Sequence, residues 1–174
     1  AAIIFSTTGL HAQKLEKVVE EFFSASSSTS LKVESKFGNV EIVNWENDEV
    51  SVKAVMWVES KRESYAEDLL DKMSVEIYSE GDVIVARSVF SDNMSNRNDT
   101  RFRIDFTIRV PEYINLDLSS KYGSAFVESL EGHAAIAVAY GNLKVQELSR
   151  GNQKPLNRIT LAYSSGTIEE ASWI

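Results

Sequence analysis

The sequence contains no cysteine, and its 174 residues include only two prolines and eight glycines. Without cysteine the chain can form no disulfide, no thiolate metal site and no thiol nucleophile, and it has no cysteine to carry a lipoprotein anchor. The scarcity of proline and glycine leaves no linker that would divide the chain. We predict one domain over residues 13–174, in which 46–111 adds strands and a helix and 112–174 forms stacked repeats.

The chain also lacks a long apolar run and an excess of positive charge. No stretch approaches the roughly 20 apolar residues of a membrane-spanning helix, so we expect no membrane span. Lys and Arg total 18 against 26 Asp and Glu, a formal net charge of −8. This charge repels nucleic acid and anionic membranes, which excludes a nucleic-acid partner. A protein or glycan partner stays open, and the sequence indicates no oligomeric state.

Residues 1–12 resemble the end of a secretory signal. An apolar run over residues 1–5 is followed by small residues that close at Ala12, the order of a hydrophobic region and a cleavage zone. We therefore predict a signal-peptide remnant over 1–12 and export to the periplasm or cell surface. The alternative is a strand at this position.

Strand patterns dominate the remaining sequence. Apolar and polar residues alternate strictly over 102–110, and similar alternation runs through 31–37, 50–58, 75–77 and 83–89. These patterns predict an all-β protein.

One helix interrupts the strands. Ser64 and Glu67 form a capping-box pattern, and Ala66, Leu69, Leu70 and Met73 would share one apolar face. We expect a short helix that lies across a sheet. The Asx-rich segment 91–100 is predicted to be a hairpin loop rather than a calcium loop, because the ordered ligand spacing of such a loop is missing.

A repeat is marked by four aromatic residues. In all four copies apolar residues lie four positions before the aromatic and five and eight positions after it. Glycine follows the aromatic in three copies, which we ascribe to its tolerance of positive φ, and Ser164 follows it in the fourth. Repeats of about 20 residues with a glycine corner are typical of stacked coils. The fold prediction is a β-solenoid, a right-handed single-stranded β-helix with a strand-rich N-terminal layer and one short helix. The aromatics are Phe37, Tyr122, Tyr140 and Tyr163.

Two segments resemble the bacterial putative-adhesin family. The first is KFGNVEI at 36–42 followed by Trp45, and the second is Val110-Pro111 leading through alternating apolar residues into KYG at 121–123. The resemblance implies an exported β-solenoid of the cell envelope, an adhesin-like domain without established catalytic or binding residues. It leads us to expect a non-catalytic adhesin or interaction scaffold. The alternatives are a β-helix enzyme that acts on polysaccharide and a periplasmic sensing or regulatory partner.

The sequence stops at Trp173-Ile174 in the middle of a repeat, and no capping element is visible. Because a stack needs a cap on its last repeat, we expect the native chain to continue or this end to meet a partner.

No combination of residues indicates catalysis. His11 falls in the predicted signal, His133 has no second histidine or cysteine with which to share a metal, and no nucleophile elbow occurs. We therefore predict no enzyme activity, no metal site and no cofactor.

Two sets of residues are candidates for contacts with a ligand or partner. Tyr122, Tyr140 and Tyr163 would form a ladder that could stack on sugars, although core packing is favoured for aromatics in phase with buried positions. An acidic stripe follows them, which we interpret as a solvated rim, with cation binding or docking to a basic partner as the alternative. The stripe consists of Glu128, Glu147, Glu169 and Glu170.

Overall fold

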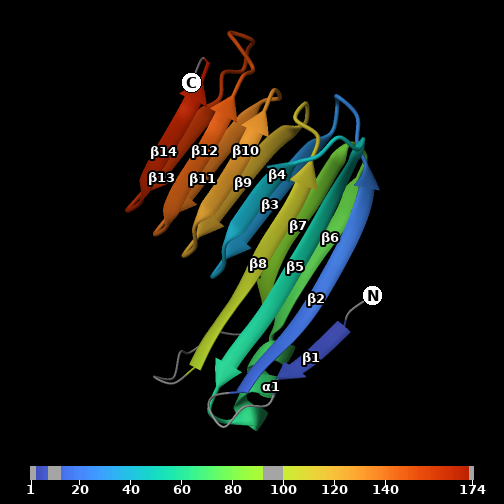
Figure 1. The fold of residues 1–174 in the computed structure, drawn as a ribbon, viewed down its shortest axis with the longest axis vertical. Coiled ribbons are helices and arrows are strands. Elements are labelled where there is room, and N and C mark those ends of the chain that lie inside the picture. Colours follow the sequence, from blue (N-terminus) through green and yellow to red (C-terminus); the bar gives the residue numbers. More distant parts are fainter. Residues whose placement is uncertain (1–2, 8–12, 92–99, 173–174) are drawn as a thin grey trace.

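The structure, a computed structural model, describes residues 3–7, 13–91 and 100–172. It consists of two layers of β-sheet and one short helix, α1 (Glu63–Asp71) (Figure 1). The eight-stranded sheet A has the order β1 (Ile3–Thr7), β2 (Gln13–Ser24), β5 (Glu49–Ser60), β8 (Thr100–Val110), β4 (Val40–Asn44), β10 (Ala125–Leu130), β12 (Asn142–Leu148) and β14 (Ser165–Ala171). The six-stranded sheet B has the order β13 (Arg158–Ala162), β11 (Ala134–Ala139), β9 (Asn115–Lys121), β3 (Ser30–Lys36), β7 (Val83–Phe90) and β6 (Met73–Glu80).

Both sheets are mixed. In sheet A the strands β8, β4, β10, β12 and β14 pair in parallel, whereas β1, β2, β5 and β8 pair antiparallel. In sheet B the strands from β7 to β13 are parallel and β6 is antiparallel to β7. The long strands β2, β5 and β8 extend past the short parallel strands toward α1 (Figure 1).

The structure is mostly β with one helix, but the predicted right-handed single-stranded β-helix is wrong. The segment 46–111 does not form a layer outside the repeats: β8 lies between β5 and β4 in sheet A, and β7 pairs directly with β3 in sheet B. Alternation along these strands specifies one buried and one exposed face. It does not specify the direction in which neighbours pair, and the spacing of the aromatics carries no information about strands outside the repeat.

The four copies of the repeat lie side by side in the parallel half. Each copy is a strand of sheet B, a corner and a strand of sheet A, which gives the pairs β3–β4, β9–β10, β11–β12 and β13–β14. Equivalent apolar residues are neighbours across the strands: Leu118 lies between Val33 and Ile136, and Val127 pairs with Val145. All five are buried between the sheets. Burial of each such side chain contributes about 1.5–3 kcal/mol of transfer free energy.

The corner glycines are required by close backbone contacts. A Cβ atom on Gly123 would lie 1.8 Å from the carbonyl oxygen of Gly38, and one on Gly141 would lie 2.0 Å from that of Gly123. A Cβ atom on Gly38 would lie 1.8 Å from the carbonyl oxygen of Ile104 in β8. Any side chain at these positions would therefore push the neighbouring repeats apart.

Positive φ is carried by the aromatic residue and not by the glycine after it. The φ angles are 57° at Phe37, 60° at Tyr122, 56° at Tyr140 and 51° at Tyr163. Our expectation that glycine supplies the left-handed conformation at these corners is therefore wrong. A left-handed conformation costs a residue with a side chain roughly 1–2 kcal/mol, so each corner needs a compensating contact.

The helix buries the face that the sequence predicts. Ala66, Leu69 and Leu70 are buried, and α1 lies against β5 and β2. The predicted capping box is wrong, because the N-cap residue is Arg62 and it makes no side-chain capping bond. Met73 is buried as the first residue of β6. Within the described residues no helix has the length and apolar character needed to cross a membrane.

Several sequence predictions concern the ends of the chain and one loop. Residues 3–7 form β1, which pairs antiparallel with β2, so part of the predicted signal remnant is a strand of sheet A. The other residues of 1–12, including His11, lie outside the described residues, as do 92–99 of the Asx-rich segment and 173–174.

Replacement of Gly123 by alanine tests the backbone contact at the corner. We expect G123A to lower the free energy of unfolding by about 2–4 kcal/mol, because the added Cβ meets a backbone carbonyl that cannot turn away. Urea unfolding followed by tryptophan fluorescence measures the change. G166A is the matched control, because its added Cβ would meet the end of the Leu161 side chain, which can rotate. Equal losses in the two variants would contradict the role of the backbone contact.

Candidate functional site

An aromatic ladder, defined as Phe37, Tyr122, Tyr140 and Tyr163, runs along the corners between the two sheets. Successive ring centroids are 5.1, 5.0 and 5.1 Å apart, and the ring planes differ by 12°, 14° and 5°. At the inner end Phe37 packs edge-on against Phe90 and Phe102. The ladder therefore starts on an aromatic cluster of β7 and β8 and ends at the last corner.

The tyrosines of the ladder are on the surface. Their exposed fractions rise from 43% at Tyr122 and 48% at Tyr140 to 84% at Tyr163. Our expectation that they pack in the core is wrong, because the corner residue lies between the two sheets and its left-handed backbone turns the ring outward. The predicted ladder itself is present.

Stacking limits what the ladder can bind. The ring faces of Tyr122 and Tyr140 are covered by their neighbours, so these residues offer ring edges and hydroxyl groups. Sugar rings stack on aromatic faces, and among the three tyrosines of the ladder only Tyr163 has a face without a ring neighbour in the described residues. The inner tyrosines therefore do not form a row of sugar platforms. Each stacked pair adds about 0.5–1.5 kcal/mol, which offsets the strain of a left-handed corner.

A groove of about 690 Å³ crosses the starts of β4, β10, β12 and β14, immediately after the ladder in the sequence of each repeat. We call it the corner groove. Its first row, two residues after each aromatic, is polar and consists of Asn39, Ser124, Asn142 and Ser165. Its second row, four residues after each aromatic, lies on the outer face of sheet A and consists of Glu41, Phe126, Lys144 and Thr167.

Hydrogen bonds across the strands hold the polar row in place. The Asn39 amide N–H donates to Oδ1 of Asp105 at 2.9 Å, and the Ser124 N–H donates to Oδ1 of Asn39 at 3.0 Å. Further along, the Ser165 hydroxyl and Oδ1 of Asn142 are 2.6 Å apart. These bonds orient the side-chain amides of Asn39 and Asn142 and the hydroxyl of Ser165 before any ligand arrives.

Phe126 is the functional candidate that sequence reasoning missed. It lies on the outer face of sheet A between Glu41 and Lys144 and is partly exposed. The signal was present in the repeat, because this outward position is polar in the other three copies and aromatic in this one. An aromatic side chain in a groove lined by amides and hydroxyls is a combination suited to a sugar.

The acidic stripe does not form one ladder. Glu128 accepts the Asn44 backbone N–H at 2.7 Å, which ties β10 to the end of β4. Glu169 pairs with Lys144 at 2.9 Å between Nζ and Oε1. Glu147 and Glu170 are cross-strand neighbours of β12 and β14. The structure thus brings two of the four predicted carboxylates together and gives the other two separate partners.

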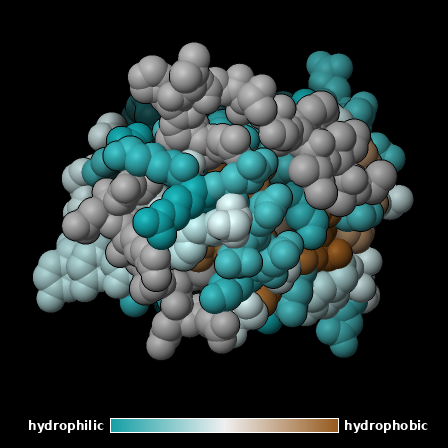
Figure 2. All heavy atoms as spheres, turned by 90° about the horizontal axis from the view of Figure 1, so that it is seen from below, coloured by the Kyte–Doolittle hydropathy of each residue, from teal (hydrophilic) through white to brown (hydrophobic). Residues whose placement is uncertain are grey.

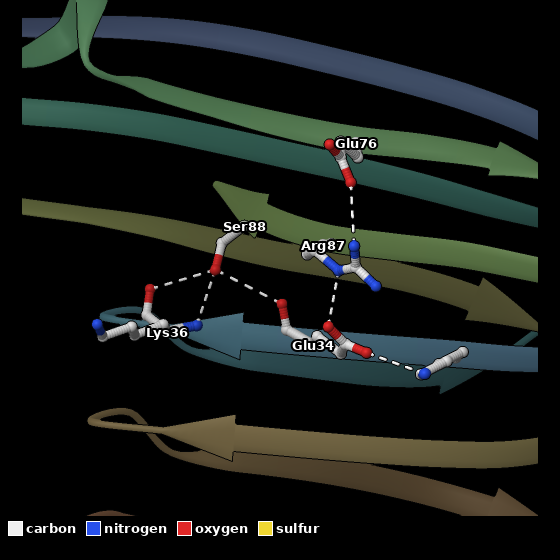
Figure 3. Close-up of polar contacts among 6 residues, drawn as sticks. Glu34, Lys36, Glu76, Arg87 and Ser88 are labelled. Atoms are coloured by element: carbon white, nitrogen blue, oxygen red, sulfur yellow. Dashed lines mark hydrogen bonds and ion pairs between the residues drawn. The ribbon is translucent and has the colours of Figure 1, made fainter. Parts of the chain in front are cut away.

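A polar cluster lies over β3, β7 and β6 of sheet B (Figure 3). Glu34 accepts a hydrogen bond from Arg87 Nε at 2.7 Å and forms an ion pair with Lys32 at 3.0 Å. Arg87 also forms an ion pair with Glu76 at 3.3 Å. The Arg87 guanidinium, followed by Lys32, holds the pKa of the Glu34 carboxyl below its ordinary value of 4.5. The cluster joins β3, β7 and β6, and we assign it a stabilising role.

The described residues contain no group of three or more His, Asp or Glu side chains that could hold a metal ion. Nε2 of His133 lies 3.1 Å from the carbonyl oxygen of Leu156, and its backbone N–H donates to Oδ1 of Asn115 at 2.9 Å. Both contacts connect neighbouring repeats.

Comparisons with known proteins found similar solved structures. A putative cell adhesion protein from Clostridium sporogenes is 11% identical, with coverage of 90% of this chain and 99% of that chain and a TM-score of 0.46. A putative adhesin from Parabacteroides merdae is 9% identical, and the match covers 88% of this chain and 57% of that chain with a TM-score of 0.36. A putative lipid binding protein from Parabacteroides distasonis is 13% identical, and the match covers 75% of this chain and 52% of that chain with a TM-score of 0.31.

No protein-family model and no curated protein matches the chain. The names of the first two structures agree with the family resemblance found in the sequence. The chain spans little more than half of the second and third structures. These likenesses are remote, so the assignment of a binding groove below rests on the residues of the chain itself.

Removal of an inner ring tests the structural role of the ladder. Y140A loses two stacked neighbours while the backbone keeps its left-handed corner, so we expect the free energy of unfolding to fall by about 1–3 kcal/mol. Y163A loses one neighbour at a site already 84% exposed, and the fall should be below about 1 kcal/mol. Thermal or urea unfolding compares them. A larger loss in Y163A would argue against a stabilising stack.

The lowered pKa of Glu34 makes its contribution to stability depend on pH. A carboxyl with a lowered folded pKa stabilises the protein above its unfolded value, near 4.5, and the effect disappears as pH falls through the folded pKa. We expect E34Q to be less stable than wild type at pH 7 by at most about 1 kcal/mol, because the pair is partly exposed. The difference should shrink below pH 4.5 in unfolding measured at several pH values. A difference that is constant with pH would overturn this assignment.

Proposed function

We propose that the protein is a non-catalytic, exported cell-envelope protein with an adhesin-like role, and that its corner groove binds an extended, neutral glycan. The observation that carries this proposal is the groove itself, in which a line of amides and hydroxyls, most of them held by hydrogen bonds across the strands, runs beside a partly exposed Phe126.

The chemistry of the groove matches an uncharged polyhydroxylated chain. Asn39 and Asn142 present amides, and Ser124 and Ser165 present hydroxyls, at the same position in four consecutive repeats. Neighbouring strands are about 4.8 Å apart, so the row offers a polar contact at each step over about 14 Å. Such periodic contacts suit a polymer more than a single small molecule. Phe126 adds an apolar surface for the face of one sugar ring.

The charged groups of the groove are arranged unfavourably for polysaccharide cleavage. Glu169 is paired with Lys144, and Glu41 lies on β4, three strands away from β14. That separation is about 14 Å at the backbone, whereas the two carboxyl groups of a glycosidase lie about 5–9.5 Å apart. The groove thus lacks a converging acid and base pair, which supports binding without hydrolysis.

One further observation supports the envelope location: the names of the structural neighbours include cell adhesion and adhesin. Residues 3–7 of the segment that resembles a secretory signal form β1, so that resemblance adds no support. The net charge of −8 disfavours acidic polysaccharides and favours neutral glycans.

Affinity gel electrophoresis with neutral polysaccharides in the gel tests the proposal. Gels that contain β-glucan, galactomannan or dextran are run beside a gel without polysaccharide. We expect at least one polymer to retard the wild-type protein and F126A to lose most of this retardation, since stacking on one aromatic contributes about 1–3 kcal/mol. Y78A is the matched control, because Tyr78 is an exposed aromatic on β6, away from the groove.

A reducing-end assay on the same polymers separates binding from cleavage. We expect no new reducing ends after prolonged incubation. If the wild-type protein releases reducing ends and E169Q does not, the protein is an enzyme and the proposal of a non-catalytic binding role is wrong. Failure of every polymer to retard the protein, or equal retardation of F126A, would overturn the assignment of the groove.

A further inference from the structure

Strand β8 adds one more position to the inner end of the corner groove. It pairs in parallel with β4. The Asn39 N–H donates to Oδ1 of Asp105 at 2.9 Å, in the same way as the Ser124 N–H donates to Oδ1 of Asn39 at 3.0 Å. Ile104 and Phe106 on either side of Asp105 are buried, so Asp105 points to the outer face of sheet A. Asp105 is therefore the β8 member of the polar row and, unlike the four residues of that row in the repeats, it carries a charge.

Three donors hold the Asp105 carboxylate in a fixed position. Oδ1 accepts the Asn39 N–H, and Oδ2 lies 2.9 Å from Nε of Arg103 and 3.3 Å from Nε1 of Trp57. Arg103 and Lys14 in turn lie over the Trp57 ring, at 4.6 and 5.1 Å from its centroid, and Trp57 is only 9% exposed. The carboxylate thus belongs to a packed cluster and is oriented before any ligand binds.

This carboxylate keeps acceptor capacity for a ligand. A carboxylate has about four lone-pair positions, and the three donors described above occupy three of them, which leaves one on Oδ1. The Asp105 side chain is 27% exposed, so a ligand can reach it. Sugar hydroxyl groups are hydrogen-bond donors, and a hydrogen bond to a charged acceptor is roughly twice as strong as one between neutral groups. Asp105 is therefore the strongest acceptor of the polar row.

We propose that Asp105 determines the specificity of the corner groove at its inner end, where its carboxylate accepts a hydroxyl group of the bound glycan. The inference rests on the proposed function of the groove, and it names the class of sugar: units with free hydroxyl groups and no acidic group. Asp105 lies one strand spacing, about 4.8 Å, beyond Asn39, so a chain that follows the polar row reaches it. A carboxyl or sulfate group at this point meets a like charge and is rejected.

The groove combines this charged acceptor with an apolar contact. Phe126 lies in the second row on β10, two strands from β8, so about 10 Å separates the two positions at the backbone. A glycan can therefore place one ring on Phe126 while a unit further along donates to Asp105. By contrast, the described surface at the end that carries α1 is mostly hydrophilic, and its hydrophobic areas are small (Figure 2).

An NMR titration of the 174-residue chain tests whether a sugar reaches Asp105. The added ligands are short oligosaccharides of β-glucan, galactomannan and dextran. The indole N–H of Trp57 bonds to the carboxylate, so its resonance, assigned by comparison with W57F, reports on this position. We expect it to shift together with the backbone N–H of Ser124. The indole N–H of Trp45, which donates to the Glu49 carbonyl, is the matched control and should not shift.

Replacement of Asp105 by asparagine removes the charge and keeps the size of the side chain and an acceptor oxygen for Asn39. In affinity gel electrophoresis we expect D105N to bind the neutral polymer about tenfold or more weakly than wild type. Wild type should bind the carboxymethylated form of the same polymer more weakly than the neutral form, and D105N should narrow this preference about tenfold. E80Q is the matched control, because it removes a carboxylate from an exposed residue of β6.

The ratio of the two polymers separates recognition from damage to the groove. A variant that only loosens the groove weakens both polymers alike and leaves their ratio unchanged. Each variant is checked for a wild-type circular dichroism spectrum, and if D105N does not fold, the Trp57 titration of the wild-type chain still decides.

The outcomes also distinguish this inference from the proposed function. If no polymer or oligosaccharide binds, the proposed function is wrong and the inference fails with it. If a neutral polymer binds and F126A weakens it, the groove is confirmed. In that case an unmoved Trp57 resonance, or a D105N variant that keeps the wild-type preference for the neutral polymer, shows that the role assigned to Asp105 is wrong.

Discussion

The close backbone contact at the corners determines how the repeats lie on one another. Gly38, Gly123 and Gly141 each let the chain approach a carbonyl oxygen of the neighbouring strand to a distance that excludes a Cβ atom. Because that contact sets the separation of the repeats, it also sets the parallel register of both sheets, the alignment of the buried residues and the spacing of the aromatic rings. Ser164 interrupts the series at the last corner, where its hydroxyl accepts the Gly141 N–H at 3.3 Å.

The aromatic ladder and the corner groove arise from the same corner but differ in chemistry. The ladder combines backbone strain with ring stacking, and these terms have similar magnitudes. It follows that the rings mainly stabilise the corners. The residues two and four positions after each aromatic do not stabilise the corner, because the strand fixes their direction and their side chains face solvent. Binding chemistry is therefore expected in the polar row and at Phe126, not along the stacked faces of Tyr122 and Tyr140.

The sequence was sufficient to predict features that depend on local periodicity. The strands around 31–37 and 102–110, the helix that buries Leu69, and the neighbouring order of the repeats follow from the spacing of apolar residues. The direction of strand pairing was not predictable from the same pattern, since either direction buries the same face. The contact of Arg87 with Glu34 joins residues far apart in the chain, and no local signal marks it. The strained φ of the corner tyrosines was assigned to the wrong residue because glycine is the usual carrier of that conformation.

The equivalent corners also make the length of the stack adjustable in units of one repeat. The unit from Tyr122 to Ala139 begins and ends at equivalent points of the stack, because the Tyr122 N–H bonds to the carbonyl of Ala139. An in-frame duplication of this unit would insert one step of about 4.8 Å without changing either sheet's register. Reach and groove length could thus change during evolution in discrete increments, while the antiparallel half with α1 stays constant.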